Sequence, residues 1–207
     1  MKNRFDMLLP FVTGRKVLDI GCVNHTAKMD DPNWLHGWLK KKAAKLVGLD
    51  YEMAEVNRMH DAGYDVKCAD AESFNIHERF DCIVAGELIE HLMNPGKFLE
   101  CVKAHLEQDG KLILTTPNAM SMRHFLQALI YGAERQNADH SLFFTARTLS
   151  KLLDKAGFKI ERVDYFHDVV YPFNMDIPRW IMDVLHRAAL LIRPEIDNHL
   201  FIAVSIK

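Results

Sequence analysis

The segment KVLDIG, Lys16–Gly21, is a short apolar run that ends in an acidic residue, an isoleucine and a glycine. A nearly continuous apolar run of this length predicts a β-strand that is covered on both faces. Four further runs of this kind follow along the chain: Leu46–Asp50, Asp65–Asp70, Phe80–Gly86 and Lys111–Thr116. The segments between them, such as Tyr51–Ala62 and Pro95–Leu106, are long enough for crossover helices. The alternation predicts an α/β domain with a parallel sheet and helices on both of its faces.

The last third of the chain does not continue this alternation of strands and crossover helices. Thr145–Gly157 is typical of a helix that begins at a threonine cap and ends at a glycine. The pattern then predicts a strand at Lys159–Phe166, an amphipathic helix at Pro178–Ile192 and a final strand at Asn198–Lys207. Five strands with crossover helices are therefore followed by two late strands that a helix separates.

The 207 residues are expected to form a single domain, residues 1–207, because this length is close to that of one ordinary domain. Two inserts interrupt the alternating plan, at residues 25–44 after the first strand and at residues 118–144 after the fifth. Long connections at the carboxyl ends of parallel strands usually recognise the substrate. Substrate choice is therefore expected to depend on these two inserts and on the helix before the last strand.

The composition excludes several classes of protein. With 26 Lys+Arg against 28 Asp+Glu, the net charge of -2 argues against a broad basic face for nucleic acid. The sequence has no uncharged apolar run of the roughly 18 residues that a membrane span needs. Asp6 and Pro10 interrupt the N-terminal apolar run, which therefore does not resemble a signal peptide. The four cysteines lack C-x-x-C spacing, so reduced thiols and a cytoplasmic location are expected.

Carboxylates follow the predicted strands at the positions where the strands end. Asp19 lies near the end of the first, Asp50 ends the second, Asp70 the third, and Glu87 follows the fourth. These ends meet at one edge of a parallel sheet and would form an acidic rim there. Such a rim repels a pyrophosphate but suits a ligand that combines a ribose with a cationic centre. Turn or cap roles remain the alternative for Asp19 and Asp70, as does a helix N-cap role for Asp50.

Five motifs then occur in a fixed order: VLDIGC, VGLDYE, CADAESF, FDCIVAGELIEHLMNPGKFLE and GKLILTTPN. In this order they resemble the class I S-adenosylmethionine-dependent methyltransferases, from about residue 15 to about residue 165. The similarity is closest to the branch with E-x-x-E-H after the fourth strand, which includes ubiquinone-type O-methyltransferases and small-RNA 2′-O-methyltransferases. The resemblance implies a Rossmann-like, doubly wound sheet of seven strands, mostly parallel with an antiparallel last strand.

The resemblance also implies a set of residues that bind S-adenosylmethionine. Asp19 and Gly21 would hold the methionine end, Asp50 the ribose hydroxyls, and Asp70 and Ala71 would face the adenine. Gly86 and Glu87 would lie near the sulfonium. The full predicted set is Asp19, Gly21, Cys22, Asn24, Asp50, Tyr51, Asp70, Ala71, Glu72, Gly86 and Glu87. One departure is clear: the family's G-x-G-x-G loop is reduced here to Gly21-Cys22-Val23-Asn24-His25, with only the first glycine kept.

A second group of residues could bind a metal ion or act as a catalytic acid–base. Glu87, Glu90 and His91 stand at i, i+3 and i+4, so a helix starting near Glu87 would place all three on one face. His140 in the second insert could join them, as a later histidine does in the RNA-methylating branch. Such a set would hold a divalent metal such as Mg²⁺, Mn²⁺ or Zn²⁺. In the alternative, His91 or His140 is a catalytic acid–base without a metal. His124 and His167 are expected to be surface or rim residues.

Three functions are compatible with this sequence. The first is O-methylation of a small-molecule acceptor, including a sugar- or lipid-linked one. The second is RNA 2′-O-methylation with a metal, against which the near-neutral charge argues, so a nucleic-acid partner is not expected. The third is a non-catalytic module that binds S-adenosylmethionine. Arg179, Trp180, Arg187 and Arg193 on an apolar stripe leave peripheral membrane contact open, and a monomer or a homodimer is expected.

Overall fold

The computed structural model describes residues 3–24, 29–132, 137–167 and 179–207, in seven α-helices, two 3₁₀ turns and seven strands. The strands are β1 (Lys16–Ile20), β2 (Lys45–Asp50), β3 (Val66–Cys68), β4 (Phe80–Gly86), β5 (Leu106–Pro117), β6 (Phe158–Phe166) and β7 (His199–Ile206). The helices are α1 (Arg4–Val12), α2 (Leu35–Lys40), α3 (Met53–Asp61), α4 (Pro95–His105), α5 (Met122–Tyr131), α6 (Ala146–Lys155) and α7 (Arg179–Ile192). The 3₁₀ turns are η1 (Ile89–His91) and η2 (Pro194–Ile196).

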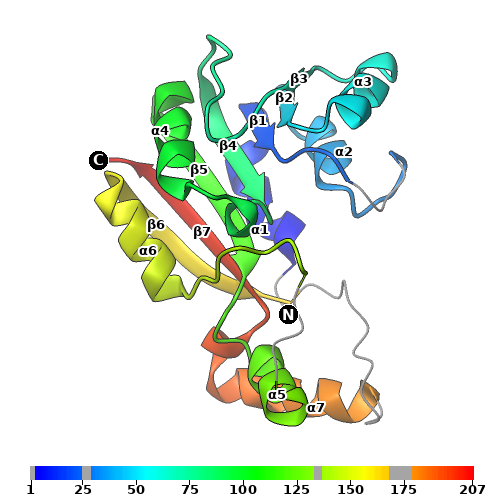
Figure 1. The fold of residues 1–207 in the computed structure, drawn as a ribbon, viewed down its shortest axis with the longest axis vertical. Coiled ribbons are helices and arrows are strands. Elements are labelled where there is room, and N and C mark those ends of the chain that lie inside the picture. The colour runs from blue at the N-terminus through cyan, green and yellow to red at the C-terminus, as the bar shows by residue number, and fades with distance from the viewer. Residues whose placement is uncertain (1–2, 25–28, 133–136, 168–178) are drawn as a thin grey trace.

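All seven strands join one sheet in the order β3-β2-β1-β4-β5-β7-β6 (Figure 1). The pairs from β3 through β5 are parallel, whereas β7 pairs antiparallel with both β5 and β6. The strand order reverses beside β1, as it does in doubly wound folds. The prediction of a mostly parallel seven-stranded sheet with an antiparallel last strand is therefore confirmed.

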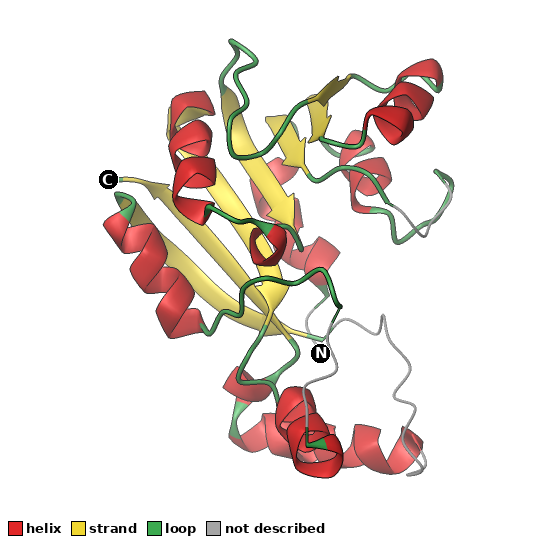
Figure 2. Ribbon diagram, viewed as in Figure 1, coloured by secondary structure: helices red, strands yellow, loops and turns green. Residues whose placement is uncertain are grey.

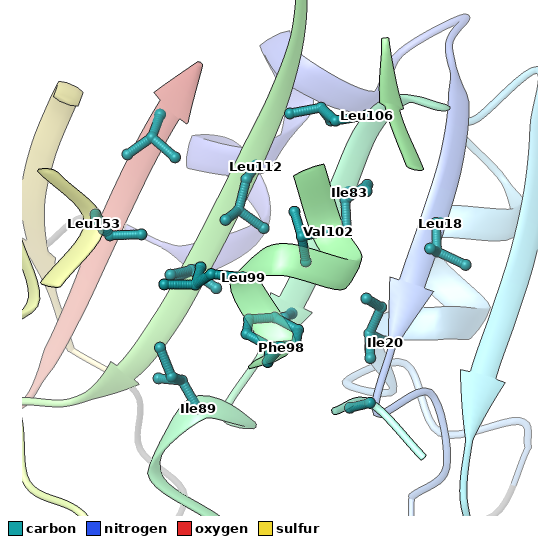
Figure 3. Packing of buried hydrophobic residues seen from close by; sticks show 14 of the residues in the cluster. Leu18, Ile20, Ile83, Ile89, Phe98, Leu99, Val102, Leu106, Leu112 and Leu153 are labelled. Carbon is teal, nitrogen blue, oxygen red and sulfur yellow. The ribbon is translucent and has the colours of Figure 1, made fainter. Parts of the chain in front are cut away.

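Helices cover both faces of this sheet (Figure 2). On one face, α4 and α6 pack over Leu18, Ile83, Leu112 and their neighbours, and Figure 3 shows Phe98 of α4 lying over the strands. On the other face, Met7, Leu8 and Val12 of α1 pack against β1, β4, β5 and β7. The strands are covered on both sides, which is why their sequences are nearly continuous apolar runs.

Two local features were not predicted from the sequence. Helix α1 has Asn3 as its N-cap, and the side chain of Asn3 accepts a hydrogen bond from the N–H of Phe5. The helix buries Met7, Leu8 and Val12, which belong to the N-terminal apolar run that was compared with a signal peptide. After β4, the helix expected near Glu87 does not form. Glu87 has a φ of 55°, and only the short turn η1 follows before Leu92 becomes extended.

The late helices lie beyond the carboxyl ends of the parallel strands. Figure 1 shows α5 and α7 beyond this edge, away from α4 and α6.

None of the helices in the described ranges is long and apolar enough to cross a membrane. The side chains of Arg179, Trp180 and Arg187, named above for membrane contact, are outside the described part, as are stretches 25–28 and 133–136 of the two inserts.

Truncating Phe98 tests the packing of α4 on the sheet. Phe98 is fully buried, so Phe98→Ala should lower the free energy of unfolding by about 3–5 kcal/mol. Phe125 in α5 is 66% exposed, and Phe125→Ala should change stability by no more than about 0.5 kcal/mol. Urea denaturation followed by circular dichroism measures both. Equal losses in the two variants would contradict the assignment of Phe98 to the core.

Candidate functional site

The parallel strands deliver the predicted site residues to one edge of the sheet. Ile20 at the end of β1 lies opposite Leu49 of β2 and Ala85 of β4, and Gly86 lies opposite Thr115 of β5. The loops that follow β1, β2 and β4 therefore start side by side. This edge is where ligands bind in open α/β sheets, beside the point at which the strand order reverses.

Asp19 is buried at this edge and is held by a histidine that the sequence did not single out. Its Oδ2 lies 2.9 Å from Nδ1 of His36, which is also buried. Its Oδ1 is buried and has no hydrogen-bond partner among the described residues. His36 lies on α2 between the apolar positions Leu35 and Leu39, and nothing in the spacing marks it. The pair fixes the carboxylate and leaves one oxygen available to a ligand donor.

The loop after β1 turns tightly with a single glycine. Gly21 has a φ of 79°, and the N–H groups of Gly21 and Cys22 both donate to the carbonyl of Leu49, at 2.8 and 3.3 Å. Trp34 Nε1 donates to the carbonyl of Cys22 at 2.9 Å. Burial raises the pKa of the Cys22 thiol, and the charges of Asp19 and Asp50 raise it further, so it stays protonated.

The buried Cys22 side chain fills space that a glycine on the neighbouring strand leaves open. A Cβ on Gly48 would lie 2.8 Å from Cys22 Sγ and 2.8 Å from Cε1 of His36. The loop then continues to Asn24, which is half-buried, while His25 lies outside the described residues. Cys22 therefore takes part in packing, and its backbone forms the loop.

Asp50 joins this loop to the start of α3. Its Oδ2 accepts a hydrogen bond from the N–H of Val23 at 3.0 Å, and its Oδ1 accepts one from the N–H of Glu52 at 3.2 Å. The N-cap of α3 is Glu52, so the alternative N-cap role for Asp50 is wrong. A carboxylate has about four acceptor positions, and Asp50 can still receive ribose hydroxyls. Tyr51 beside it is 70% exposed.

The predicted adenine-side residues form a turn after β3. Asp70 is exposed, and its Oδ1 accepts a hydrogen bond from the N–H of Glu72 at 2.9 Å. Ala71 is buried, and Oε1 of Glu72 accepts one from the N–H of Asn94 at 2.7 Å. Asn94 is the N-cap of α4. Asp70 therefore has the turn role that was one of its alternatives, and Glu72 connects this turn to α4.

Glu87 and Glu90 follow β4 with different surroundings. Glu90 is 1% exposed, and its Oε2 accepts a hydrogen bond from the hydroxyl of Thr116 at 2.9 Å. Burial raises the pKa of Glu90 well above its usual value, and the nearby charge of Glu87 raises it further. Each of the two carboxylates keeps one buried oxygen, Oε1, with no partner in the described part of the chain.

The second insert, residues 118–144, contacts η1 at Glu90. The N–H groups of Ser141 and Leu142 donate to the carbonyl of Glu90 at 2.9 and 3.1 Å. The rings of His91 and His140 consequently meet at right angles, with centroids 4.6 Å apart. Burial lowers the pKa of His140, and the positive charges of His91 and His124 lower it further, which favours the neutral imidazole.

Three of the four predicted metal ligands converge. One ligand atom from each of Glu90, His91 and His140 lies within 4.8 Å of the others. Glu87 does not belong to this group, and its Oε2 lies 3.6 Å from Nε2 of His199 at the start of β7. Two imidazoles and a carboxylate suit a divalent ion of the zinc or manganese type. The same arrangement can accept a proton from a hydroxyl.

The family assignment rests first on sequence. A family model described as a methyltransferase domain matches residues 2–163. Ubiquinone biosynthesis O-methyltransferase of Bradyrhizobium diazoefficiens is 29% identical over 154 residues, which cover 68% of this chain and 56% of that protein. The mitochondrial protein of the same name from Rattus norvegicus is 26% identical over 208 residues, covering 91% of this chain and 56% of its own length. The chain thus spans little more than half the length of these relatives.

Solved structures agree on the fold. An S-adenosylmethionine-dependent methyltransferase from Mesorhizobium loti has a TM-score of 0.62 at 19% identity, over 97% of this chain and 95% of that one. Magnesium protoporphyrin IX methyltransferase from Synechocystis PCC 6803, solved with bound S-adenosylhomocysteine (SAH), has a TM-score of 0.64 at 12% identity, over 98% and 80%. With the sheet order and the glycine turn after β1, these matches lead to one conclusion: the chain belongs to the methyltransferase domain family and has the fold of the class I S-adenosylmethionine-dependent enzymes.

Proposed function

We propose that this chain transfers the methyl group of S-adenosylmethionine to a hydroxyl oxygen of a small-molecule acceptor. The observation that carries the proposal is a set of buried carboxylate oxygens without hydrogen-bond donors in the described residues, on Asp19, Glu87 and Glu90. Asp19 lies near the end of β1, Glu87 directly follows β4, and Glu90 lies in η1. Unpaired buried carboxylates are costly, and a cationic ligand would compensate them. The ammonium and sulfonium of S-adenosylmethionine are such cations.

The backbone supports a nucleoside on the neighbouring side. Asp50 is held by the N–H groups of Val23 and Glu52, so a ribose would meet a fixed carboxylate. Charge-assisted hydrogen bonds of this type are stronger than neutral ones. The turn Asp70–Glu72, fastened to α4 through Asn94, would border the adenine. The proposal thus assigns the methionine end to Asp19 and Gly21 and the nucleoside to Asp50, Tyr51, Asp70 and Ala71.

The acceptor end of the reaction would lie at His91 and His140. In methyl transfer the hydroxyl oxygen attacks the methyl carbon in line, the carbon–sulfur bond breaks, and its electron pair returns to sulfur. The oxygen must also lose its proton. A neutral imidazole can accept that proton, and the lowered pKa of His140 favours this form. The relatives are named O-methyltransferases, which supports oxygen as the acceptor atom.

A divalent ion is the alternative way to activate the hydroxyl. Glu90, His91 and His140 fit such an ion in donor type and spacing, and Oε1 of Glu90 is a buried oxygen without a partner among the described residues. A bound ion supplies Lewis acidity, which lowers the pKa of a coordinated hydroxyl. The chain's own contribution is then to orient the three ligands through Thr116 and through the hydrogen bonds of Ser141 and Leu142.

Cofactor binding is tested with SAH. Calorimetry should detect binding to the unaltered chain, and Asp50→Asn should weaken it at least tenfold, because the charged acceptor for the ribose is lost. Asp61→Asn, at an exposed position at the end of α3, is the matched control and should bind normally. Absence of binding to the unaltered chain would refute the enzymatic proposal altogether.

The role of His140 is tested by activity. His140→Ala should lower the rate of methyl transfer by about 10²–10⁴-fold while leaving SAH affinity unchanged. His60→Ala, at an exposed position on α3, is the control. A panel of phenols and alcohols, with methylated products detected by mass spectrometry, provides the measurement. An RNA oligonucleotide belongs in the same panel, and methylation of RNA alone would overturn the small-molecule assignment.

Chelation separates the two ways of activating the hydroxyl. If a divalent ion activates it, prolonged dialysis against EDTA should abolish turnover, and Zn²⁺, Mn²⁺ or Mg²⁺ should restore it. His91→Ala would then lose both turnover and the bound ion. If His140 acts alone as a base, His91→Ala should leave the metal content of the chain unchanged. Metal content measured by mass spectrometry before and after dialysis accompanies both assays.

A further inference from the structure

A second cluster of metal-binding side chains lies outside the site described above. His167 directly follows β6, His186 lies on α7, and Asp197 lies between η2 and β7. One ligand atom from each residue lies within 4.8 Å of the other two. His167, which was expected to be a surface or rim residue, packs against His186, with ring centroids 5.0 Å apart. No step of the proposed reaction uses this cluster.

The distances match those between the ligands of a tetrahedral ion. Oδ1 of Asp197 lies 3.2 Å from Nε2 of His186 and 3.3 Å from Nδ1 of His167. Zinc binds imidazole nitrogen and carboxylate oxygen at about 2.0–2.2 Å, which places neighbouring tetrahedral ligands about 3.3–3.5 Å apart. The carboxylate and the two nitrogens can therefore take an ion between them with little movement of the chain.

The cluster is buried, although its members are polar. His186 and Asp197 are 9% and 6% exposed, and the side chain of His167 is 18% exposed. The Asp197 carboxylate is held by hydrogen bonds with His167 and His186 and by one from the N–H of Asn198.

Asn198 supplies a second, independent sign of a missing ligand. Its Nδ2 lies 3.1 Å from Nδ1 of His167, while its Oδ1 is buried and has no partner in the described ranges. Rotating the amide by half a turn exchanges the two atoms and turns the oxygen toward the cluster. Two imidazole nitrogens, one carboxylate oxygen and one amide oxygen would then complete a four-ligand site.

We propose that His167, His186 and Asp197 bind a structural divalent transition-metal ion of the zinc class, with the amide oxygen of Asn198 as the fourth ligand. Imidazole and carboxylate are established ligands of zinc, and four-coordinate closed sites are typical of structural zinc. The ion would connect the end of β6, α7 and the start of β7. The proposal is independent of the function proposed for the first site.

The position of this cluster gives the ion a defined role. Asn118 lies directly after β5, and its Nδ2 donates to the carbonyls of Glu195 at 2.9 Å and Asp197 at 2.8 Å. Its backbone N–H donates to the carbonyl of Asn198 at 2.8 Å. The chain next to the cluster therefore holds the beginning of the second insert. The neighbouring residue, His199, lies 3.6 Å from Glu87 at the first site. An ion here would fix α7 beside the region in which the acceptor is expected.

The test removes the other candidate site first. The double variant His91→Ala, His140→Ala is stripped of metal with EDTA, and Zn²⁺ is then returned by dialysis. We expect one Zn²⁺ per chain by mass spectrometry, and a rise in Tm of about 5–10 °C when free zinc exceeds the Kd a hundredfold. Replacing Zn²⁺ with Co²⁺ should give the intense visible absorption of a tetrahedral site.

Adding Asp197→Asn to this background should remove the zinc and the rise in Tm, whereas adding His60→Asn, on the exposed face of α3, should remove neither. Should the double variant fail to fold, the same comparison applies to the otherwise unaltered chain, where Asp197→Asn should lower the zinc content by one ion. Circular dichroism verifies that each variant is folded. Failure of the folded protein to retain zinc, or retention by a folded Asp197→Asn variant, would overturn the proposal.

Discussion

Burial of β4 on both faces is the constraint on which the rest of the structure depends. Ile83 and Ala85 pack under α4, while Cys82 and Val84 pack against the face that α1 covers. The strand is held between β1 and β5, so its end at Gly86 has a fixed place. The chain leaves this place by a sharp turn, in which Glu87 has a positive φ. The position of Glu87, Glu90 and His91 follows from that turn.

The carboxylates at the sheet edge fall into two groups with different chemistry. Asp50 and Asp70 receive hydrogen bonds from backbone N–H groups and so help to shape the loops. Asp19, Glu87 and Glu90 each retain a buried oxygen without a donor among the described residues. A protein interior rarely leaves such groups unpaired, since each one lowers stability. The second group therefore marks where a cation is expected, and the first marks the support around it.

The sequence predicted the sheet well and the details of the site less well. The strands are nearly continuous apolar runs with turn residues between them, so their number and approximate places along the chain could be read directly. The start of β5 could not, because it begins at Leu106 and not at the predicted Lys111. The convergence of His140 with His91 could be expected only through the family resemblance, since 48 residues separate them along the chain. Nothing in the spacing of residues along the sequence indicates that His36 pairs with Asp19. Periodicity also did not predict that η1 is only a short turn, which is followed closely by α4 with Asn94 as its N-cap.

The tight contact between Cys22 and Gly48 has a consequence for how the family's glycine-rich loop can vary. The space above Gly48 is the space that the Cys22 sulfur occupies, and His36 closes it from the side. The sizes of residues 22 and 48 are therefore linked across two strands. A glycine at position 22 would leave a void here unless a larger residue stood at position 48. A larger side chain at either position would have to displace the other, so the pair sets how closely the loop after β1 can approach β2.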